Sequence, residues 1–227
     1  ATPSNAVAKA GDGDTIWVSN GAYAVEVEIA IEKAITLRSV NGWSDTILYR
    51  PVSSTNRILV ISNALAVVDG FSITNGFLNG NNLQGAGVRL YVGGLQNCLI
   101  QSNRIYTAGP GQPVFGGGVG LSGGWMSNCV IRGNAALTLN GYGGRPLGGG
   151  VYMTGGEVLA CTVVDNIAEG ALTPTYGGIG GGYGGGIHMT GGSVINSVVA
   201  RNWAPEEGGG IYLSGASSRV LHCTLAL

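Results

Sequence analysis

The feature that most constrains this chain is a glycine-rich unit repeated in tandem. Four successive segments read GAGVRLYVGGLQNCLIQSN, GGGVGLSGGWMSNCVIRGN, GGGVYMTGGEVLACTVVDN and GGGIHMTGGSVINSVVARN. The last residue of each opening triplet, including a fifth triplet, serves as origin: Gly87, Gly118, Gly150, Gly186 and Gly210. These origins are 31, 32, 36 and 24 residues apart, although the spacing inside each unit is constant. A unit with fixed internal spacing predicts a solenoid of stacked coils that takes insertions at one corner.

Inside each unit, apolar residues alternate with polar or small ones, and glycine pairs separate the short runs. This period of two predicts strands with one buried face. Equivalent strands of successive coils then stack about 4.8 Å apart, with like residues above one another. The predicted inward columns are Val88, Val119, Val151, Ile187 and Ile211, and Leu90, Leu121, Met153, Met189 and Leu213.

Two polar columns follow from the same spacing. A corner ladder with amides bonded from coil to coil is predicted for Asn75, Asn103, Asn134, Asn166 and Asn202. The second column holds Cys98, Cys129 and Cys161, with Cys223 expected to continue it. Stacked thiols are favoured over disulfides there, because strand spacing is a little long for a good bridge. No metal site is expected, since no histidine lies near this column.

The charge content narrows the functional classes. Only 10% of residues are charged, the net charge is -1, and the only lysines are Lys9 and Lys33. Nucleic-acid binding is therefore not expected, because it depends on clustered basic residues. No apolar run approaches the roughly 20 residues that a membrane helix needs, and the first residues lack the pattern of a signal peptide.

The segments GDTIWVSNGAY, KAITLRSVNG, VVDGFSITNG and GGGVYMTGG, with NCVIRGN-type runs, carry a family resemblance over nearly the whole chain. The chain resembles the right-handed parallel β-helix, or pectate-lyase-like, superfamily. Within it, the chain is most similar to Gly-rich repeat proteins of bacterial surfaces, of the polymorphic outer-membrane and autotransporter-passenger type. The resemblance implies an all-β, single-stranded right-handed parallel β-helix of roughly eight coils. It also implies an extracellular or bacterial cell-surface location.

We expect one domain over residues 1–227, with a cap region at 1–14. The last residues, RVLHCTLAL, stop in mid-strand, so we expect the natural chain to be longer. The C-terminal edge would then be a site for end-to-end self-association.

A row two residues after each origin is predicted to face outward: Arg89, Gly120, Tyr152, His188 and Tyr212. A polysaccharide lyase needs a base and a cationic group beside the uronate carboxylate. His188 is the candidate base, Tyr152 and Tyr212 would stack on sugar rings, and Arg89 is the candidate cation. The alternative is that aromatic side chains stack well on a sheet face and the histidine has no catalytic role.

Other chemistry finds less support. A glycoside hydrolase needs paired carboxylates, whereas Asp165 aligns with Arg201 and predicts an ion pair. The run GGIGGGYGGG contains GxGxxG, but no helix follows to hold a phosphate, and it lacks the aspartates of a calcium β-roll. No cofactor is expected.

The insertions RIYTAGPGQPVF, AALTLNGYGGRPL and IAEGALTPTYGGIGGGY leave from one corner of three consecutive coils. Their candidate ligand-binding residues are Tyr106, Tyr142, Arg145, Tyr176 and Tyr183. Such loops suit a recognition surface, a lid, or packing over the outward row Leu99, Val130, Thr162 and Val198. Our leading hypothesis is a non-catalytic scaffold that presents these loops to a carbohydrate or another surface molecule. The alternatives are a polysaccharide lyase acting on an acidic glycan and a purely architectural segment.

Overall fold

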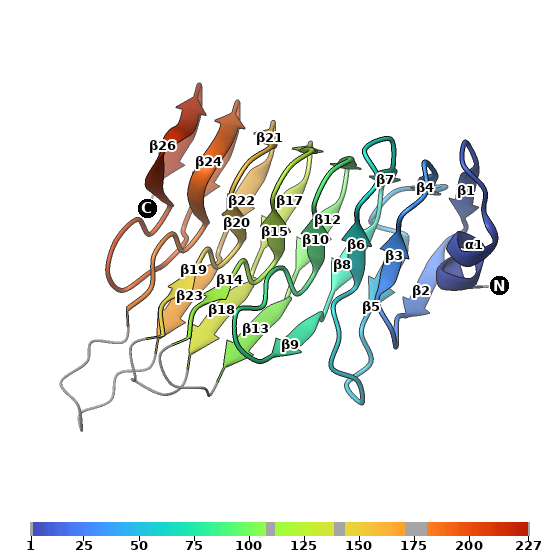
Figure 1. The fold of residues 1–227 in the computed structure, drawn as a ribbon, viewed down its shortest axis with the longest axis horizontal. Coiled ribbons are helices and arrows are strands. Elements are labelled where there is room, and N and C mark those ends of the chain that lie inside the picture. The colour runs from blue at the N-terminus through green and yellow to red at the C-terminus, as the bar shows by residue number, and fades with distance from the viewer. Residues whose placement is uncertain (1, 108–111, 139–143, 171–180, 227) are drawn as a thin grey trace.

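The chain is a parallel β-helix, an elongated stack of coils (Figure 1). The computed structural model describes residues 2–107, 112–138, 144–170 and 181–226. Strands pair in parallel in all four sheets, with equivalent residues of successive repeats in register. The predicted fold class is confirmed, and the repetition of the sequence is thereby explained as stacking of like on like.

The largest sheet has two rows of strands joined at its C-terminal end. The first row contains β1 (Thr15–Val18), β4 (Thr36–Ser39), β7 (Val67–Asp69), β11 (Gly94–Gln96), β16 (Trp125–Ser127) and β21 (Glu157–Leu159). The second row contains β3 (Ile29–Ile31), β6 (Leu59–Ile61), β10 (Val88–Leu90), β15 (Val119–Leu121) and β20 (Val151–Met153). Two long strands span both rows, β24 (Ile187–Ile195) and β26 (Ile211–Leu221).

The second sheet has one strand from each coil, eight in the described residues, so the helix has eight coils there. Its strands are β2 (Gly21–Ala24), β5 (Thr46–Tyr49), β8 (Ser72–Thr74), β12 (Leu99–Gln101), β17 (Val130–Arg132), β22 (Thr162–Val164), β25 (Val198–Ala200) and β27 (Thr224–Ala226).

The insertions add two small sheets, which we call the insertion arm. The third sheet contains β9 (Phe77–Asn79), β13 (Arg104–Thr107), β18 (Ala135–Thr138) and β23 (Ile167–Gly170), and the fourth contains β14 (Val114–Phe115) and β19 (Pro146–Leu147). The arm has its own apolar cluster of Ala86, Ile105, Val114 and Ala136, separate from the main core. The insertions are thus partly regular structure, and they return to the coil at the next glycine triplet.

The triplets form a seam between the two cores. We call the stacked residues 116–118, 148–150, 184–186 and 208–210 the glycine seam. Backbone bonds of 3.1 Å run along it, from the N–H of Gly117 to the carbonyl of Gly148 and from that of Gly149 to Gly184. A Cβ atom at Gly149 would overlap the backbone of Ile167 and Gly185. Glycine is therefore required here by close approach of the backbone.

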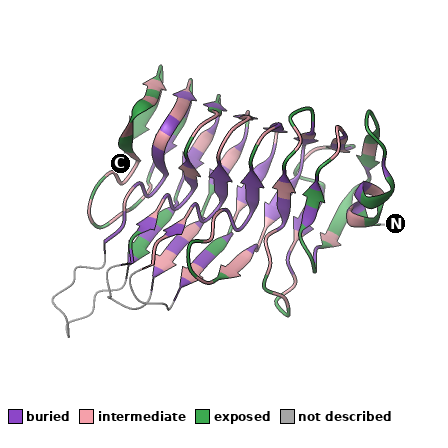
Figure 2. Cartoon of the chain, in the orientation of Figure 1, coloured by how far each residue is buried: buried purple, intermediate pink, exposed green. Residues whose placement is uncertain are grey.

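The main core fills the inside of every coil (Figure 2). Val88, Val119, Val151 and Ile187 pair in register and are fully buried. Leu90, Leu121, Met153 and Met189 form the second predicted column and are equally buried. The two predicted inward columns are confirmed at these positions, whereas Ile211 and Leu213 continue the register on the last described coil without being fully buried.

The asparagine ladder is confirmed at four of its five predicted positions: Asn103, Asn134, Asn166 and Asn202. The Nδ2 of Asn134 donates to Ile100 O and to Asn166 Oδ1, both at 3.0 Å. Its Oδ1 accepts from the backbone N and the Nδ2 of Asn103, also at 3.0 Å. Each buried amide is thus satisfied by the coils on either side of it.

The prediction is wrong for Asn75, which lies one position before the ladder. Asn75 has a φ of +63° and aligns with Ser102, whose φ is +54°. The ladder position of that coil is Gly76, whose N–H donates to Asn103 Oδ1 at 2.8 Å. Asn75 serves instead as a left-handed corner, a conformation that asparagine tolerates well.

The predicted thiol column is confirmed: all four cysteines are free, and Cys98, Cys129 and Cys161 are buried. The thiols make weak hydrogen bonds to the backbone. Cys161 Sγ accepts from Cys129 N at 3.4 Å, and Cys129 Sγ donates to Ser127 O at 3.3 Å. Ser197 and Cys223 continue the column. Burial and the neighbouring thiols raise the pKa of Cys129 well above its ordinary value, which disfavours the thiolate, the reactive form of cysteine.

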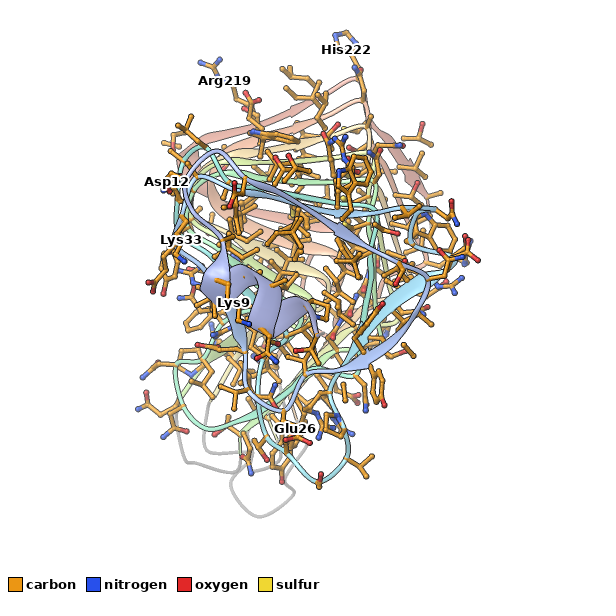
Figure 3. All side chains as sticks on the ribbon, turned by 90° about the vertical axis from the view of Figure 1, so that its right-hand side faces the viewer. Lys9, Asp12, Glu26, Lys33, Arg219 and His222 are labelled. Carbon is orange, nitrogen blue, oxygen red and sulfur yellow. The ribbon has the colours of Figure 1, made fainter. Side chains whose placement is uncertain are left out.

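The N-terminal end is covered by helix α1 (Pro3–Lys9). The Thr2 hydroxyl accepts from Asn5 N at the start of this helix, and Val7 is buried against the first coil. Lys33 Nζ donates to Ala8 O at 3.0 Å and to Ala10 O at 2.6 Å, which ties the helix end to the coil. Figure 3 views the molecule from this end. No helix among the described residues is long and apolar enough to cross a membrane.

The last described strands are more exposed than their neighbours. Leu213 is 53% exposed and Leu225 58%, whereas Met189 and Val199, one coil earlier, are fully buried. Self-association through this end stays a prediction. The predicted ion pair between Asp165 and Arg201 is present, with Nε and Oδ1 2.8 Å apart, on the surface of the second sheet.

Candidate functional site

The candidate site lies on the outward-facing residues of the second row of strands in the largest sheet. Arg89, Gly120, Tyr152, His188 and Tyr212 pair in register from coil to coil. They alternate with the inward columns, so their side chains point away from the main core. The predicted row is therefore present, and its order along the helix is as expected.

The last three members form a continuous stack of rings. The ring centroids of Tyr152 and His188 are 5.4 Å apart with an interplanar angle of 27°. Those of His188 and Tyr212 are 5.1 Å apart. Both separations fall in the range of favourable ring pairs. The row thus holds the imidazole between two phenol rings.

The insertion arm covers this row. Gln84, Phe115, Leu147, Tyr183 and Glu207 bridge in parallel from coil to coil, forming a second outward column. The ring centroid of Phe115 lies 4.7 Å from that of Tyr152, and that of Tyr183 lies 4.8 Å from that of Tyr212. Cover by the arm explains why the row is not an open stripe.

Burial differs from the expectation of an open sheet face. His188 is only 4% exposed and Arg89 only 8%. The outward row that the insertions could alternatively pack over is not uniformly covered, since Leu99 is 3% exposed and Val198 41%, and the arm's rings contact the tyrosine row.

Burial also sets the charge of the site. It lowers the pKa of His188 to about 4, so the imidazole is neutral at pH 7. His188 Nδ1 is buried and has no hydrogen-bond partner among the described residues. Burial raises the pKa of Tyr152, an effect that the positive charge of Arg89 opposes. The stacked rings of Tyr152 and His188 are therefore both uncharged at pH 7.

Arg89 does not join this group. It is three coils from His188, which is about 14 Å at the usual strand spacing. Its Nη2 donates to Ser122 Oγ at 2.7 Å, and its guanidinium lies 4.3 Å from the ring centroid of Tyr91. Its position over Gly120 is possible because that residue has no side chain. Arg89 and His188 thus cannot contact one reacting carbon together.

The covered row opens into a pocket of about 350 Å³ toward its C-terminal end. The lining residues are Pro113, Arg145, Leu147, Tyr183, His188 and Tyr212. The guanidinium of Arg145 lies 5.3 Å from the ring centroid of Tyr183. Chiefly the neighbouring Glu206 carboxylate, and secondarily burial, raise the pKa of Tyr183. The lining offers ring faces, phenol hydroxyls, one guanidinium and one neutral imidazole.

The predicted loop residues divide into three groups. Arg145 and Tyr183 line the pocket. Tyr106 is paired within the third sheet, beside the buried Ile105 and therefore on the opposite, outer face of the arm. Tyr142 and Tyr176 lie outside the described residues.

Sequence reasoning missed the apolar members of the covering column, Phe115 and Leu147. The signal was available: Gln84, Phe115, Leu147, Tyr183 and Glu207 each precede their glycine origin by three residues. The offset predicts a column as firmly as the offsets that lie after the triplet.

The fold and site define the class of the chain as a parallel β-helix with an aromatic pocket beside its glycine seam. No protein-family model matches the chain, and no curated protein matches it. Among solved structures, the chain is similar to the pectin methylesterase from Aspergillus niger, at 13% identity with a TM-score of 0.44. The match covers 99% of this chain and 82% of that one.

Proposed function

We propose that this domain is a non-catalytic carbohydrate-binding scaffold and that the pocket around His188 and Tyr212 is its binding site. The observation that carries the proposal is a neutral imidazole held between two phenol rings at a pocket with a guanidinium on its lining. Aromatic faces with a few fixed polar groups are typical of ligand pockets. Sugars present both apolar faces and hydroxyl groups to such a surface.

Rigidity supports the same role. The rings are fixed by the pairing of four coils and by the covering column, so little side-chain freedom is lost when a ligand binds. The resemblance of the glycine-rich units to bacterial surface repeat proteins supports an extracellular or cell-surface location. In that setting the helix would act as a spacer that presents the arm to a glycan.

Two observations favour binding over lyase chemistry. A base with a pKa of about 4 is too weak for efficient removal of a carbon-bound proton at neutral pH. The candidate cation, Arg89, is three coils away from that base. Among the described residues, none that lines the pocket is acidic, so this lining lacks the carboxylate pair of a glycoside hydrolase.

The test is a titration of the ¹⁵N-labelled protein with a panel of neutral and acidic oligosaccharides, followed by NMR. We expect one or more to give saturable shifts at the amides of His188 and Tyr212. Tyr212→Ala should raise the Kd about threefold to tenfold, the loss expected for one aromatic contact. Tyr91→Ala removes an exposed tyrosine outside the pocket and should leave the Kd unchanged.

The lyase alternative is assayed in parallel, by the ultraviolet absorbance of unsaturated product on uronate polysaccharides. Product that forms with the wild type and is lost in His188→Ala would replace our proposal with the lyase. Blank titrations across the whole panel would leave the architectural alternative in its place.

A further inference from the structure

A second pocket, of about 340 Å³, lies at the N-terminal part of the insertion arm. It shares no residue with the pocket around His188. Its lining comes from the segment after β5, the corner after β8 and the corner after β12, and its polar members are Arg50, Ser54, Thr55, Asn75, Ser102 and Arg104. Among the described residues, the lining includes two arginines and no acidic residue.

Arg50 is fixed in place at the pocket. It is 7% exposed, and its Nε donates to Asn75 O at 2.7 Å. Its Nη1 donates to Pro51 O at 2.8 Å and also to Ser54 O. The guanidinium lies 5.4 Å from the ring centroid of Phe77. These acceptors are neutral carbonyls, so they do not neutralise the guanidinium. Among the described residues none accepts from Nη2, so this group of Arg50 can still donate a hydrogen bond to a ligand.

Arg104 supplies the second positive charge. It begins β13, pairs in register with Phe77 and is exposed. The ion pairs of the described chain are Arg38–Asp69, Arg57–Glu28 and Arg201–Asp165. Neither Arg50 nor Arg104 takes part in one. The pocket therefore carries two positive charges that the described part of the protein does not neutralise, and such a cluster attracts anions.

The other polar groups of the lining are compatible with the same ligand. The hydroxyl group of Ser54 already donates to Pro51 O at 3.1 Å, whereas those of Thr55 and Ser102 are donors as well as acceptors. The amide of Asn75 is already engaged, since its Nδ2 donates to Arg50 O at 2.8 Å. Guanidinium and hydroxyl donors with no competing carboxylate match the oxygen acceptors of a carboxylate or sulfate group.

We propose that this pocket binds the oxyanion of a small ligand, a carboxylate, sulfate or phosphoryl group, between the fixed guanidinium of Arg50 and the exposed guanidinium of Arg104. The site does not depend on the proposed function, because it lies on other coils and uses other residues. A carbohydrate-binding protein with this second site would distinguish acidic from neutral saccharides.

The test is an NMR titration of the ¹⁵N-labelled protein with sodium sulfate, sodium glucuronate and sodium phosphate, with glucose as the neutral control, at constant ionic strength. We expect saturable shifts at the amides of residues 52–55, 75–77 and 102–104 with at least one anion, and none with glucose. Arg104→Gln should raise the Kd about tenfold, the effect of losing one charge-assisted contact. Arg104 is exposed, so this variant should fold normally.

Arg219→Gln is the matched control, because it removes the same charge from an exposed side chain that projects from the surface of another coil (Figure 3). Its Kd should equal that of the wild type. Preference for glucuronate would assign the site to uronic acids, preference for sulfate to sulfate esters, and preference for phosphate to phosphoryl groups; all three support an oxyanion site. Equal weakening in the two variants, an unchanged Kd in Arg104→Gln, or shifts that do not saturate would each overturn the proposal.

Discussion

Replacement of Asn134 by alanine tests whether the amide ladder holds the coils together. The side chain is 1% exposed and makes four hydrogen bonds, two as donor and two as acceptor. Without it, the backbone N–H of Asn103 loses its acceptor inside the protein. An orphaned buried donor costs about 1–3 kcal/mol, and each of the other three bonds contributes about 0.5–1.5 kcal/mol net. The expected loss of unfolding free energy is therefore about 3–7 kcal/mol.

Asn128→Ala is the control variant. Asn128 is also a corner asparagine, but it is exposed, has a φ of +52° and donates from its Nδ2 to Asn97 Oδ1 at 2.8 Å. Alanine is strained in this left-handed conformation by about 1–2 kcal/mol. Asn134 does not have a positive φ, so its replacement by alanine removes hydrogen bonds without adding backbone strain.

Urea denaturation followed by circular dichroism measures both variants. Because repeat proteins can unfold in parts, the slope of the transition must be compared as well as its midpoint, and amide exchange of Asn103 reports the local effect. If Asn134→Ala lost no more stability than Asn128→Ala, the ladder would be a by-product of the corner geometry and our reasoning about it would be refuted.

Two further predictions concern the site and the seam. The pKa of His188 in the folded protein, about 4, lies below the ordinary value of 6.5, so the unfolded chain binds more protons between these two pH values. The free energy of unfolding should therefore keep its full value above about pH 6.5 and fall by up to about 3 kcal/mol as the pH drops toward 4. Urea unfolding midpoints measured across this pH range should fall in the wild type and fall less in His188→Gln. If the midpoints of both proteins fell equally with pH, His188 would not be the group responsible. Gly149→Ala should cost at least about 3 kcal/mol by backbone overlap, whereas Gly133→Ala, with a φ of +59° and open space, should cost about 1 kcal/mol. Thermal unfolding of both variants compares them, and similar losses would argue against the close approach.

Where residues recur at a constant offset from the glycine triplets, their stacking into columns could be predicted from the sequence. The columns of Val119 and Leu121, the cysteine column and the ladder at Asn134 all follow from a single alignment of the units. The prediction failed at Asn75 because the early coils lack the glycine triplet that fixes the origin. There, hydrogen bonding selected Gly76, whose N–H reaches the next coil.

The site was predicted in part. Sequence alignment placed Tyr152, His188 and Tyr212 in one row, since this depends only on register. It did not predict that the row would be buried, because burial depends on how the insertions fold back over it. The final coil shows a similar effect: the register of β24 and β26 shifts between Met189 and Gly191, so Cys223 comes later than the constant spacing predicts.

The glycine seam separates the length of an insertion from the geometry of the coil. Each coil that carries a triplet is joined to the next such coil by backbone bonds, such as Gly185 N to Gly208 O at 3.1 Å, regardless of how many residues precede the triplet. Peptides of foreign sequence grafted between the third sheet and a triplet should therefore leave the strand register unchanged. A lineage of such proteins would be free to diversify its exposed arm while conserving the spiral frame, much as variable loops diversify on a constant scaffold.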